Sequence, residues 1–503
     1  MTDLAVIADD VWLYWLERDI ELRRKFGLPI EHLPDITFAA VEHEAEFARA
    51  ILQRLDAVQP ADEDERLTAA IVRWHCERSI DELSLFWYRF PVTPYRTLFF
   101  GIHNALPHAK PALAEMPRFV DDILGVLREQ ERRGIRIPKD EIPTVRALFE
   151  NLAQSLSPEI ARLLAHFDDE YAGRAPDGVG LSQYPGGAEA YRAFVRQETT
   201  TELTPEEIHE LGLQEIARIE RELDKVRHDA AFRGSLIEFR RFLKTDERFF
   251  VKTPEEFAKR LMAPVQRIEA QVPRFFLRTP KAPYGVERLP VEFEGGDTFG
   301  YYQGPTAAEP QGTYYFNGSM LGERSLLRAA ALIAHELIPG HHFQIALQEE
   351  NESLPTLRRE TLPTAFCEGW AEYAAWLGTE MGIYDDPYDR AGRLMMDAML
   401  SARLVVDTGM NALGWSRKRA SDYLREHTML SDTEIATETL RYAVDIPAQA
   451  LSYKIGSLKM IELRALAKDH DVREFHEWII GSGALPLPLL EEHVRHAMSA
   501  SST

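Results

Sequence analysis

A His-Glu pair near the middle of the chain is the first feature that could carry chemistry. It opens the run HELIPGHH at residues 335–342, and the preceding SLLRAAALIA is almost continuously apolar, which predicts a buried helix. Unpaired polar groups are costly in an apolar environment, and a metal ion that binds the imidazole beside the carboxylate would compensate that cost. We therefore expect His335 to bind a metal, with Glu336 next to it.

The spacing of the histidines departs from the familiar zinc-peptidase helix. In His-Glu-x-x-His, two histidines on one helix face bind zinc and the glutamate acts as general base. Here His341 and His342 follow His335 by six and seven residues, a rise of roughly 9 to 10.5 Å on an ideal helix, which is too far for one ion. Pro339 and Gly340 can break the helix. We predict His341 as the second ligand, and His342 as the alternative ligand or a residue that supports a ligand or faces substrate.

A carboxylate from a later helix is the expected third ligand. Glu368 lies 27 residues after His341, in a segment with helical apolar spacing, PTAFCEGWAEYAAWLG. Three protein ligands would leave a fourth position for water, so we expect one Zn²⁺ ion per chain. Glu372, one turn further on, could hold a ligand histidine through its other ring nitrogen. A solvated charge is the alternative reading of Glu372.

The composition is that of a globular protein. The chain has 503 residues, enough for two or three lobes, and 45% of them are hydrophobic. The formal net charge is −23 with the acids dispersed, and such a surface repels phosphate backbones. We expect no nucleic-acid partner, and the sequence leaves the oligomeric state open.

Helical periodicity dominates the chain and predicts a mainly α fold. A Gly- and Pro-rich stretch at 172–187 marks a boundary between an N-terminal helical lobe, 1–180, and a second region, 181–503. Alternating β-rich runs between residues 279 and 320 predict a small sheet next to the motif helix. The clearest helical segments are 39–57, 62–84, 142–166, 205–228, 253–271 and 386–407.

Cysteine usage and the N-terminal segment bear on location. Cys76 and Cys367 are too few for a disulfide framework and form no Cys-x-x-Cys pair. The first residues carry aspartates where a signal peptide carries Lys or Arg. No run of about 18 uncharged apolar residues could span a bilayer. We expect a cytoplasmic protein with no membrane partner.

Four motifs resemble a known family, the bacterial proteins grouped as domain of unknown function 885. They are HELIPGHHFQ at 335–344, CEGWAEY at 367–373, RLVVDTGMNALGW at 403–415 and RYAVDIPAQALSYKIG at 441–456. The resemblance implies a mostly helical, metallopeptidase-like fold related to zincins whose third ligand is Glu, with no settled substrate for most members. We expect two helical lobes around a cleft. Two positions depart from the family pattern: Asn411 stands where His is common, and Ala448 where Gly is common.

The late motifs supply candidates for the remaining roles. A metal-activated water would lose its proton to Glu336, and Tyr453 or Tyr442 would donate a hydrogen bond to the oxyanion, unless these tyrosines belong to the core. Asp407 could support a ligand imidazole or cap a helix. Asn411, Gln449 and Arg441 are further candidates for ligand support or substrate contact, and Arg441 could instead form a structural ion pair.

A zinc metallopeptidase that cleaves short peptides is the function that these residues favour. A strand such as GTYYFN, at the edge of the small sheet, could pair with an extended peptide. One alternative is a zinc enzyme that acts on a small amide or ester, suggested by Asn411. Another is a noncatalytic zincin scaffold, suggested by the absent His-Glu-x-x-His spacing, although the free carboxylate of Glu336 argues against it.

Overall fold

The computed structural model describes residues 3–105, 109–291, 294, 300–306 and 309–501. The described part is mainly helical with one small sheet, which confirms the predicted fold class. Among the described helices, none is both long enough and apolar enough to cross a membrane.

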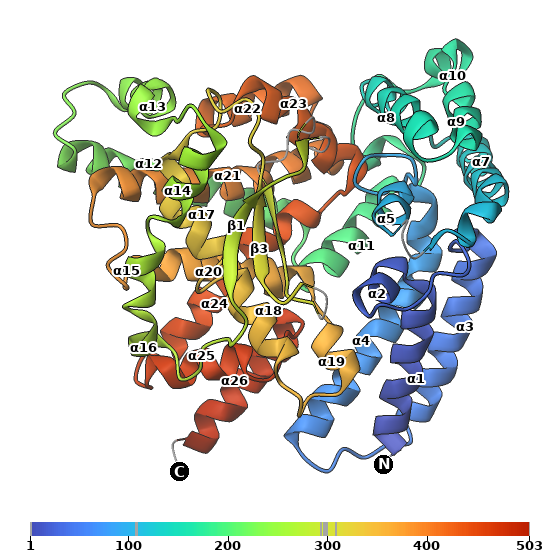
Figure 1. Ribbon diagram of the computed structural model, residues 1–503, viewed down its shortest axis with the longest axis horizontal. Helices are drawn as coiled ribbons and strands as arrows, with labels where there is room; N and C mark the ends of the chain where they lie inside the picture. The colour runs from blue at the N-terminus through green and yellow to red at the C-terminus, as the bar shows by residue number, and fades with distance from the viewer. Residues whose placement is uncertain (1–2, 106–108, 292–293, 295–299, 307–308, 502–503) are drawn as a thin grey trace.

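The helices before residue 175 gather on one side of the molecule (Figure 1). The first part contains the antiparallel pair α3 and α4, against which α1 packs. We refer to this part as the N-terminal lobe. Its helices are α1 (Asp3–Arg18), α2 (Ile20–Lys25), α3 (Phe38–Leu55), α4 (Glu63–Leu85), α5 (Phe99–Asn104), α7 (Met116–Arg132), α8 (Ile142–Ser155), α9 (Ala161–His166) and α10 (Asp169–Arg174).

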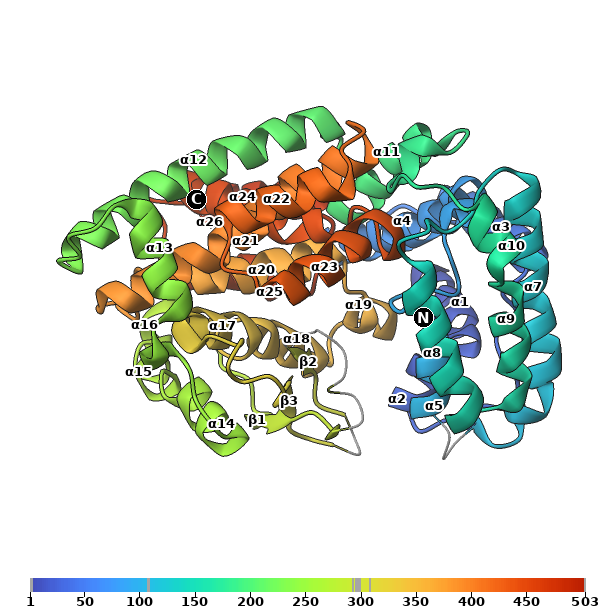
Figure 2. The ribbon, with the colours of Figure 1, turned by 90° about the horizontal axis from the view of Figure 1, so that it is seen from above.

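The remaining chain forms layers of helices over the sheet (Figure 2). The long α12 packs along α21, and α20 packs against α24 and α17. The helices before the sheet are α11 (Gly187–Thr199), α12 (Pro205–Asp229), α13 (Leu236–Thr245), α14 (Pro254–Met262), α15 (Val265–Glu269) and α16 (Val272–Phe275). Those after it are α17 (Ala329–Glu336), α18 (His341–Glu349), α19 (Thr356–Glu360), α20 (Thr364–Leu377), α21 (Pro387–Asn411), α22 (Arg417–His427), α23 (Asp432–Leu440), α24 (Ser452–Leu466), α25 (Val472–Ile480) and α26 (Leu487–Ser501).

The sheet has three strands in the order β1 (Tyr284–Arg288), β3 (Gly312–Phe316), β2 (Gly300–Gln303). β3 runs parallel to β1 and antiparallel to β2. The expectation that GTYYFN forms an edge strand is therefore wrong, because β3 is hydrogen-bonded on both sides. In the described sheet, β1 and β2 are the edge strands, one on each side of β3.

Helix starts follow the expected chemistry, but two long predicted helices are broken. Thr204 caps α12 in a capping box with Glu207. The predicted helix 142–166 divides into α8 and α9 near Pro158, and 253–271 divides into α14 and α15 at Pro264. Proline lacks the N–H that a continuous helix needs and clashes with the preceding turn, so each prediction of one helix is corrected to two.

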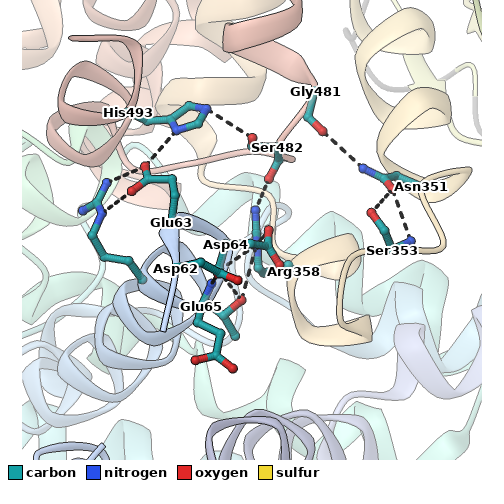
Figure 3. Close-up of polar contacts among 12 residues, drawn as sticks. Asp62, Glu63, Asp64, Glu65, Asn351, Ser353, Arg358, Gly481, Ser482 and His493 are labelled. Atoms are coloured by element: carbon teal, nitrogen blue, oxygen red, sulfur yellow. Dashed lines mark hydrogen bonds and ion pairs between the residues drawn. The ribbon is translucent and has the colours of Figure 1, made fainter. Parts of the chain in front are cut away.

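A buried arginine joins the N-terminal lobe to the rest of the chain (Figure 3). Arg358, with an exposed fraction of 1%, donates to the carboxylate of Asp64 at 2.6 Å and to the carbonyl of Ser482 at 2.5 Å. Nearby, His493 contacts Glu63 and the hydroxyl of Ser482, each at 3.1 Å. The start of α4 is thereby tied to α19, to the segment after α25 and to α26, which fixes one end of the contact between the two parts.

Candidate metal centre

The motif helix breaks where the Pro-Gly step lies. α17 ends at Glu336, α18 begins at His341, and the Leu337 backbone between them has φ −108° and ψ −93°. A Cβ on Gly340 would lie 1.8 Å from the His335 carbonyl oxygen, so only glycine fits this close approach. The indole of Trp370 on α20 donates to the Pro339 carbonyl at 2.9 Å. The bend therefore turns α18 back and brings His341 towards His335.

Three side chains converge at the bend. The ligand atoms of His335, His341 and Glu368 all lie within 4.8 Å of one another. Glu368 Oε2 is 3.2 Å from His341 Nε2 and 3.6 Å from His335 Nε2. Ligands at about 2.0–2.1 Å around a tetrahedral zinc ion are about 3.3 Å apart. The two distances to Glu368 thus match the edge of a tetrahedron around zinc, and the two imidazoles lie within 4.8 Å of each other.

Glycines also bring Glu368 into place. α20 and α24 cross at Gly369 and Gly456, where a Cβ on Gly369 would lie 2.5 Å from the Gly456 Cα. This close crossing sets the position of Glu368, the residue before Gly369. Larger residues would force the helices apart and move the carboxylate.

The charges around His335 stabilise a cation at this position. Burial lowers the pKa of His335, but Glu368 and Glu372 outweigh burial and raise it to about 10. Burial likewise raises the pKa of Glu368, and the imidazoles of His341 and His335 outweigh it and lower that pKa far below its usual range. A metal cation could replace the proton that these groups otherwise hold, so metal binding should compete with protons.

Glu372 supports His335 from behind. Its Oε2 atom lies 3.7 Å from His335 Nδ1, and its Oε1 atom forms an ion pair with Arg393 of α21 at 2.7 Å. Both His335 and Glu372 are buried. Glu372 is therefore not the solvated charge of the alternative reading, and its place next to Nδ1 leaves Nε2 directed at Glu368 and His341.

Glu336 lines a cavity of about 370 Å³ beside the three converging side chains, which we call the centre cavity. Burial raises the pKa of Glu336 above its usual value, whereas the His335 and His341 imidazoles lower it in part. Because Glu336 lines the cavity, its carboxylate can contact a molecule bound there, although Glu336 is not one of the three converging side chains.

Tyr453 is the tyrosine of the late motif that reaches the centre cavity. The centroid of its ring lies 6.2 Å from that of His335, with the ring planes 10° apart, and the Arg403 guanidinium lies 4.8 Å from the Tyr453 ring centroid. Burial raises the pKa of Tyr453, so its hydroxyl stays protonated and can donate a hydrogen bond. The side chain is suitably placed for the oxyanion role.

Tyr442 does not belong to the lining of the centre cavity as the structure describes it. Its hydroxyl accepts from Arg403 Nε at 2.7 Å and donates to Glu438. Arg403 also forms an ion pair with Glu438 at 2.9 Å. The prediction of Tyr442 as an oxyanion donor is therefore corrected, because its hydroxyl is hydrogen-bonded to Arg403 and Glu438 behind the cavity.

His342 points to the sheet and not to the converging triad. Its Nε2 lies 3.1 Å from the Ala282 carbonyl, which can only accept, so Nε2 carries the proton and Nδ1 accepts from the Tyr302 hydroxyl at 2.9 Å. Burial lowers the pKa of His342 to about 4, which keeps the ring neutral. His342 is thus placed as the partner of Tyr302, and His341 is the histidine that faces His335.

Asp407 and Asn411 form a buried network away from the ligand histidines. Asp407 accepts from Tyr191 at 2.7 Å and from the Ala448 amide, and Asn411 donates to Asp407 and to the Tyr442 carbonyl. Burial raises the pKa of Asp407 to about 7. The expectation that Asp407 supports a ligand imidazole is corrected, because Glu372 occupies that place.

The Asn411 side chain is fully engaged in the same network. Its oxygen accepts from the Leu181 amide at 3.0 Å. Asn411 therefore contributes to the contact between α21 and the segment before α11 and is not among the described cavity-lining residues. Its difference from the family pattern lies outside the cavity.

Arg441 lines the centre cavity, but its charge is already paired. It forms an ion pair with Glu438 at 3.2 Å and donates to Gln449 at 2.9 Å. Gln449 thereby holds Arg441 and is not among the described residues of the cavity wall. Arg441 is thus part of the cavity wall, and Gln449 supports it from outside the described lining.

Two tyrosines of the sheet line the centre cavity and were missed as site residues. Tyr302 of β2 lies beside His341, with ring centroids 6.3 Å apart, and Tyr314 of β3 has a buried hydroxyl that makes no hydrogen bond within the described structure. The alternating GYYQ and TYYF runs predicted strands, but only the strand order shows which tyrosines face the cavity.

The chain belongs to the DUF885 family, described as a bacterial protein of unknown function. The family model matches residues 108–494, more than half of the chain. The resemblance expected from the four motifs is thereby confirmed. No curated protein matches the sequence.

Two solved structures share the fold across nearly the whole chain. Each is of a "putative lipoprotein", one from Colwellia psychrerythraea and one, of unknown function, from Shewanella oneidensis. The first has a TM-score of 0.85 at 21% identity and covers 99% of both chains. The second has a TM-score of 0.75 at 15% identity and covers 98% of this chain and 99% of its own. At such identities the likeness shows the fold alone.

Proposed function

We propose that this protein is a zinc-dependent hydrolase with a zincin-like centre, and most specifically a metallopeptidase that cleaves short peptides. The observation that carries the proposal is the convergence of His335, His341 and Glu368, with the carboxylate of Glu336 in the adjoining cavity. A purely structural zinc site would have no use for that additional carboxylate.

The residues present fit a zinc ion. Two imidazole nitrogens and one carboxylate oxygen form the donor set of a catalytic zinc site, and the distances of 3.2 and 3.6 Å suit a tetrahedral edge. Among the three proposed donor atoms, Glu368 Oε2 is buried and lacks a hydrogen-bond partner among the described residues, as expected of an atom that binds an ion. When bound, zinc would activate water and polarise a substrate carbonyl as a Lewis acid.

The chain's own residues would supply the proton transfers and the hydrogen bond. Glu336 accepts a proton on a carboxylate oxygen from the attacking water and returns it to the leaving amine. Tyr453 donates its hydroxyl hydrogen to the carbonyl oxygen as negative charge develops there. Glu372 and Arg393 keep His335 in the orientation that directs Nε2 into the centre.

The edge of β2 is the reason to favour a peptide substrate. Gly300, Tyr301 and Tyr302 all line the centre cavity, and β2 pairs with β3 on one side. An extended peptide could add to the other side through main-chain hydrogen bonds. A small amide or ester would make no use of this edge.

Turnover by the zinc-loaded protein tests the proposal. A series of peptides of increasing length and a panel of acylated metabolites separate the peptidase from the small-amide alternative. Glu336→Gln should lower kcat by roughly 10²- to 10⁴-fold, because the base is lost while the shape is kept. Glu380→Gln, at the surface after α20, is the control and should keep full activity. Retained turnover in Glu336→Gln would refute the base assignment, and no stoichiometric zinc would favour the noncatalytic alternative.

A cytoplasmic location is also proposed on the basis of the sequence. Cys76 and Cys367 are free and buried, in keeping with a reducing compartment. The lipoprotein description of the two structural relatives belongs to those proteins and suggests the contrary location, attached to a membrane outside the cytoplasm. Fractionation of cells that express the full chain decides: recovery with membranes would overturn the cytoplasmic proposal.

A further inference from the structure

A second cavity of about 680 Å³ adjoins the centre cavity. Helices α1, α3 and α4 of the N-terminal lobe and α11 of the following region contribute to its walls. Leu362 lines both cavities, and the consecutive residues Tyr95 and Arg96 line the first and the second. A ligand that extends past Leu362 from the centre would therefore enter the second cavity, which we call the lobe cavity.

Two arginines of the lobe cavity have little compensation for their charge. Arg78 donates to the Gln197 carbonyl at 3.0 Å, and Arg96 donates to the Asp445 carbonyl at 3.2 Å. Both side chains are half-buried, and neither forms an ion pair with a residue that the structure describes. The rest of each guanidinium fork is available to the cavity, where planar donors suit a bidentate oxyanion.

The electrostatic effect of this arrangement is visible in both arginines. Burial, together with the Arg89 guanidinium, lowers the pKa of Arg96 to about 10, because Glu198 compensates these effects only in part. The pKa of Arg78 is also lowered, first by burial, with Glu198 acting against it and Arg89 with it. Removal of positive charge, or addition of negative charge, would relieve the cluster.

The other charges of the lobe cavity are mostly engaged. Arg89 pairs with Glu82 at 2.6 Å, Glu44 accepts from the Ser79 hydroxyl, and Asp19 caps α2. Arg18 lies 3.5 Å from the ring centroid of Tyr14. Glu198 is the carboxylate that acts most strongly on both Arg78 and Arg96, and Glu82, which already pairs with Arg89, adds a smaller contribution to each.

Aromatic side chains form much of the remaining wall. Trp15 and Trp74 flank His75, with centroid distances of 5.1 and 4.9 Å. Burial lowers the pKa of His75 to about 3, so this ring adds no positive charge at neutral pH. Phe47 also lines the cavity. The wall thus offers an apolar surface next to the two guanidinium groups.

We propose that Arg78 and Arg96 form a subsite for a carboxylate carried by the substrate, with an apolar or aromatic group beside it. The identity of this ligand as a substrate rests on the hydrolase proposed above, whereas binding of the carboxylate does not. The subsite selects substrates that carry an acidic group on the part that passes Leu362.

Calorimetric titration with two matched probes tests the binding. N-acetylphenylalanine carries a carboxylate, and its amide has the same body without the charge. Protein stripped of metal with a chelator excludes binding of the carboxylate to zinc. The acid should bind at least about tenfold more tightly than the amide, since a buried charge pair is worth that or more. The Arg78→Gln/Arg96→Gln double variant should lose this difference, while Arg73→Gln, on the same helix as Arg78 but not among the described residues of the lobe cavity, should keep it.

Equal binding of acid and amide to the wild type, or tight acid binding by the folded double variant, would overturn the proposal. A double variant that fails to melt cooperatively leaves the wild-type comparison as the decisive result. Inorganic phosphate that binds more tightly than N-acetylphenylalanine would also overturn the assignment to a carboxylate. Binding selectivity without turnover of any peptide by the zinc-loaded protein would support the subsite and contradict the hydrolase. Turnover without selectivity would do the reverse.

Discussion

Glu141 on the N-terminal lobe allows a sharp prediction for stability. Its side chain is 1% exposed, and both carboxylate oxygens lack hydrogen-bond partners among the described residues. Asp445, which is also buried, lies near enough to act on its charge. Burial, and then the Asp445 charge, raise the pKa of Glu141 to about 9, whereas the unfolded chain should have a value near 4.5. The folded protein therefore holds a proton on Glu141 that the unfolded chain releases.

The sign of the pH dependence follows from this difference. A carboxyl group whose pKa is raised in the folded protein does not lower the free energy of unfolding below pH 4.5. Above that pH, each pH unit lowers the free energy of unfolding by about 1.4 kcal/mol until the folded pKa is reached. Between pH 5 and pH 7 the penalty grows by about 2 to 3 kcal/mol. Glu141→Gln keeps the shape and removes the ionisable group. The variant should thus gain stability over the wild type as pH rises.

Urea unfolding at a series of pH values measures the effect. The free energy of unfolding of Glu141→Gln minus that of the wild type should grow by about 2 to 3 kcal/mol from pH 5 to pH 7. Glu150→Gln, an exposed glutamate on the adjoining α8, is the matched control and should show a flat difference. A flat difference for Glu141→Gln, or one that falls with pH, would refute the reasoning, because Glu141 would then be ionised in the folded protein.

Three further predictions concern the candidate metal centre. Glu372→Gln removes the negative charge beside His335 Nδ1 and should weaken zinc affinity by roughly 10- to 100-fold in a competition assay with a chelator, and unchanged affinity would contradict a supporting role. Gly340→Ala places a Cβ against the His335 carbonyl and should abolish stoichiometric zinc binding or destabilise the protein by at least about 2 kcal/mol, whereas wild-type values of both would contradict the tight bend. Tyr453→Phe should lower kcat by roughly 10²- to 10³-fold with little change in KM, and an equal loss in Tyr442→Phe would contradict the choice between the two tyrosines.

The broad fold could be predicted from local patterns. Apolar periodicity gave the mainly α architecture, and the Thr-Pro-Glu-Glu runs located the starts of α12 and α14. The breaks at Pro158 and Pro264 were overlooked because the apolar residues have helical spacing on both sides of each proline. The order of the strands depends on pairing between distant segments, so the sequence alone could not show that β3 is central.

The centre itself was more predictable than its surroundings. A proline and a glycine in the motif helix imply a bend, because one removes a donor and the other permits a close approach. The partners of Asp407 could not be inferred in the same way. They come from α11 and from the backbone at Ala448, two segments that only the tertiary fold brings to Asp407. The same applies to Tyr302, whose role depends on His342 and on the sheet edge.

One measurement tests the central claim most directly: anomalous X-ray scattering at the zinc edge from crystals of the purified full-length protein. A single strong peak is expected between His335 Nε2, His341 Nε2 and Glu368 Oε2, at about 2.0–2.2 Å from each donor atom. Crystals grown in zinc that show no peak between these three side chains, or a peak bound by His342 in place of His341, would contradict the proposed centre.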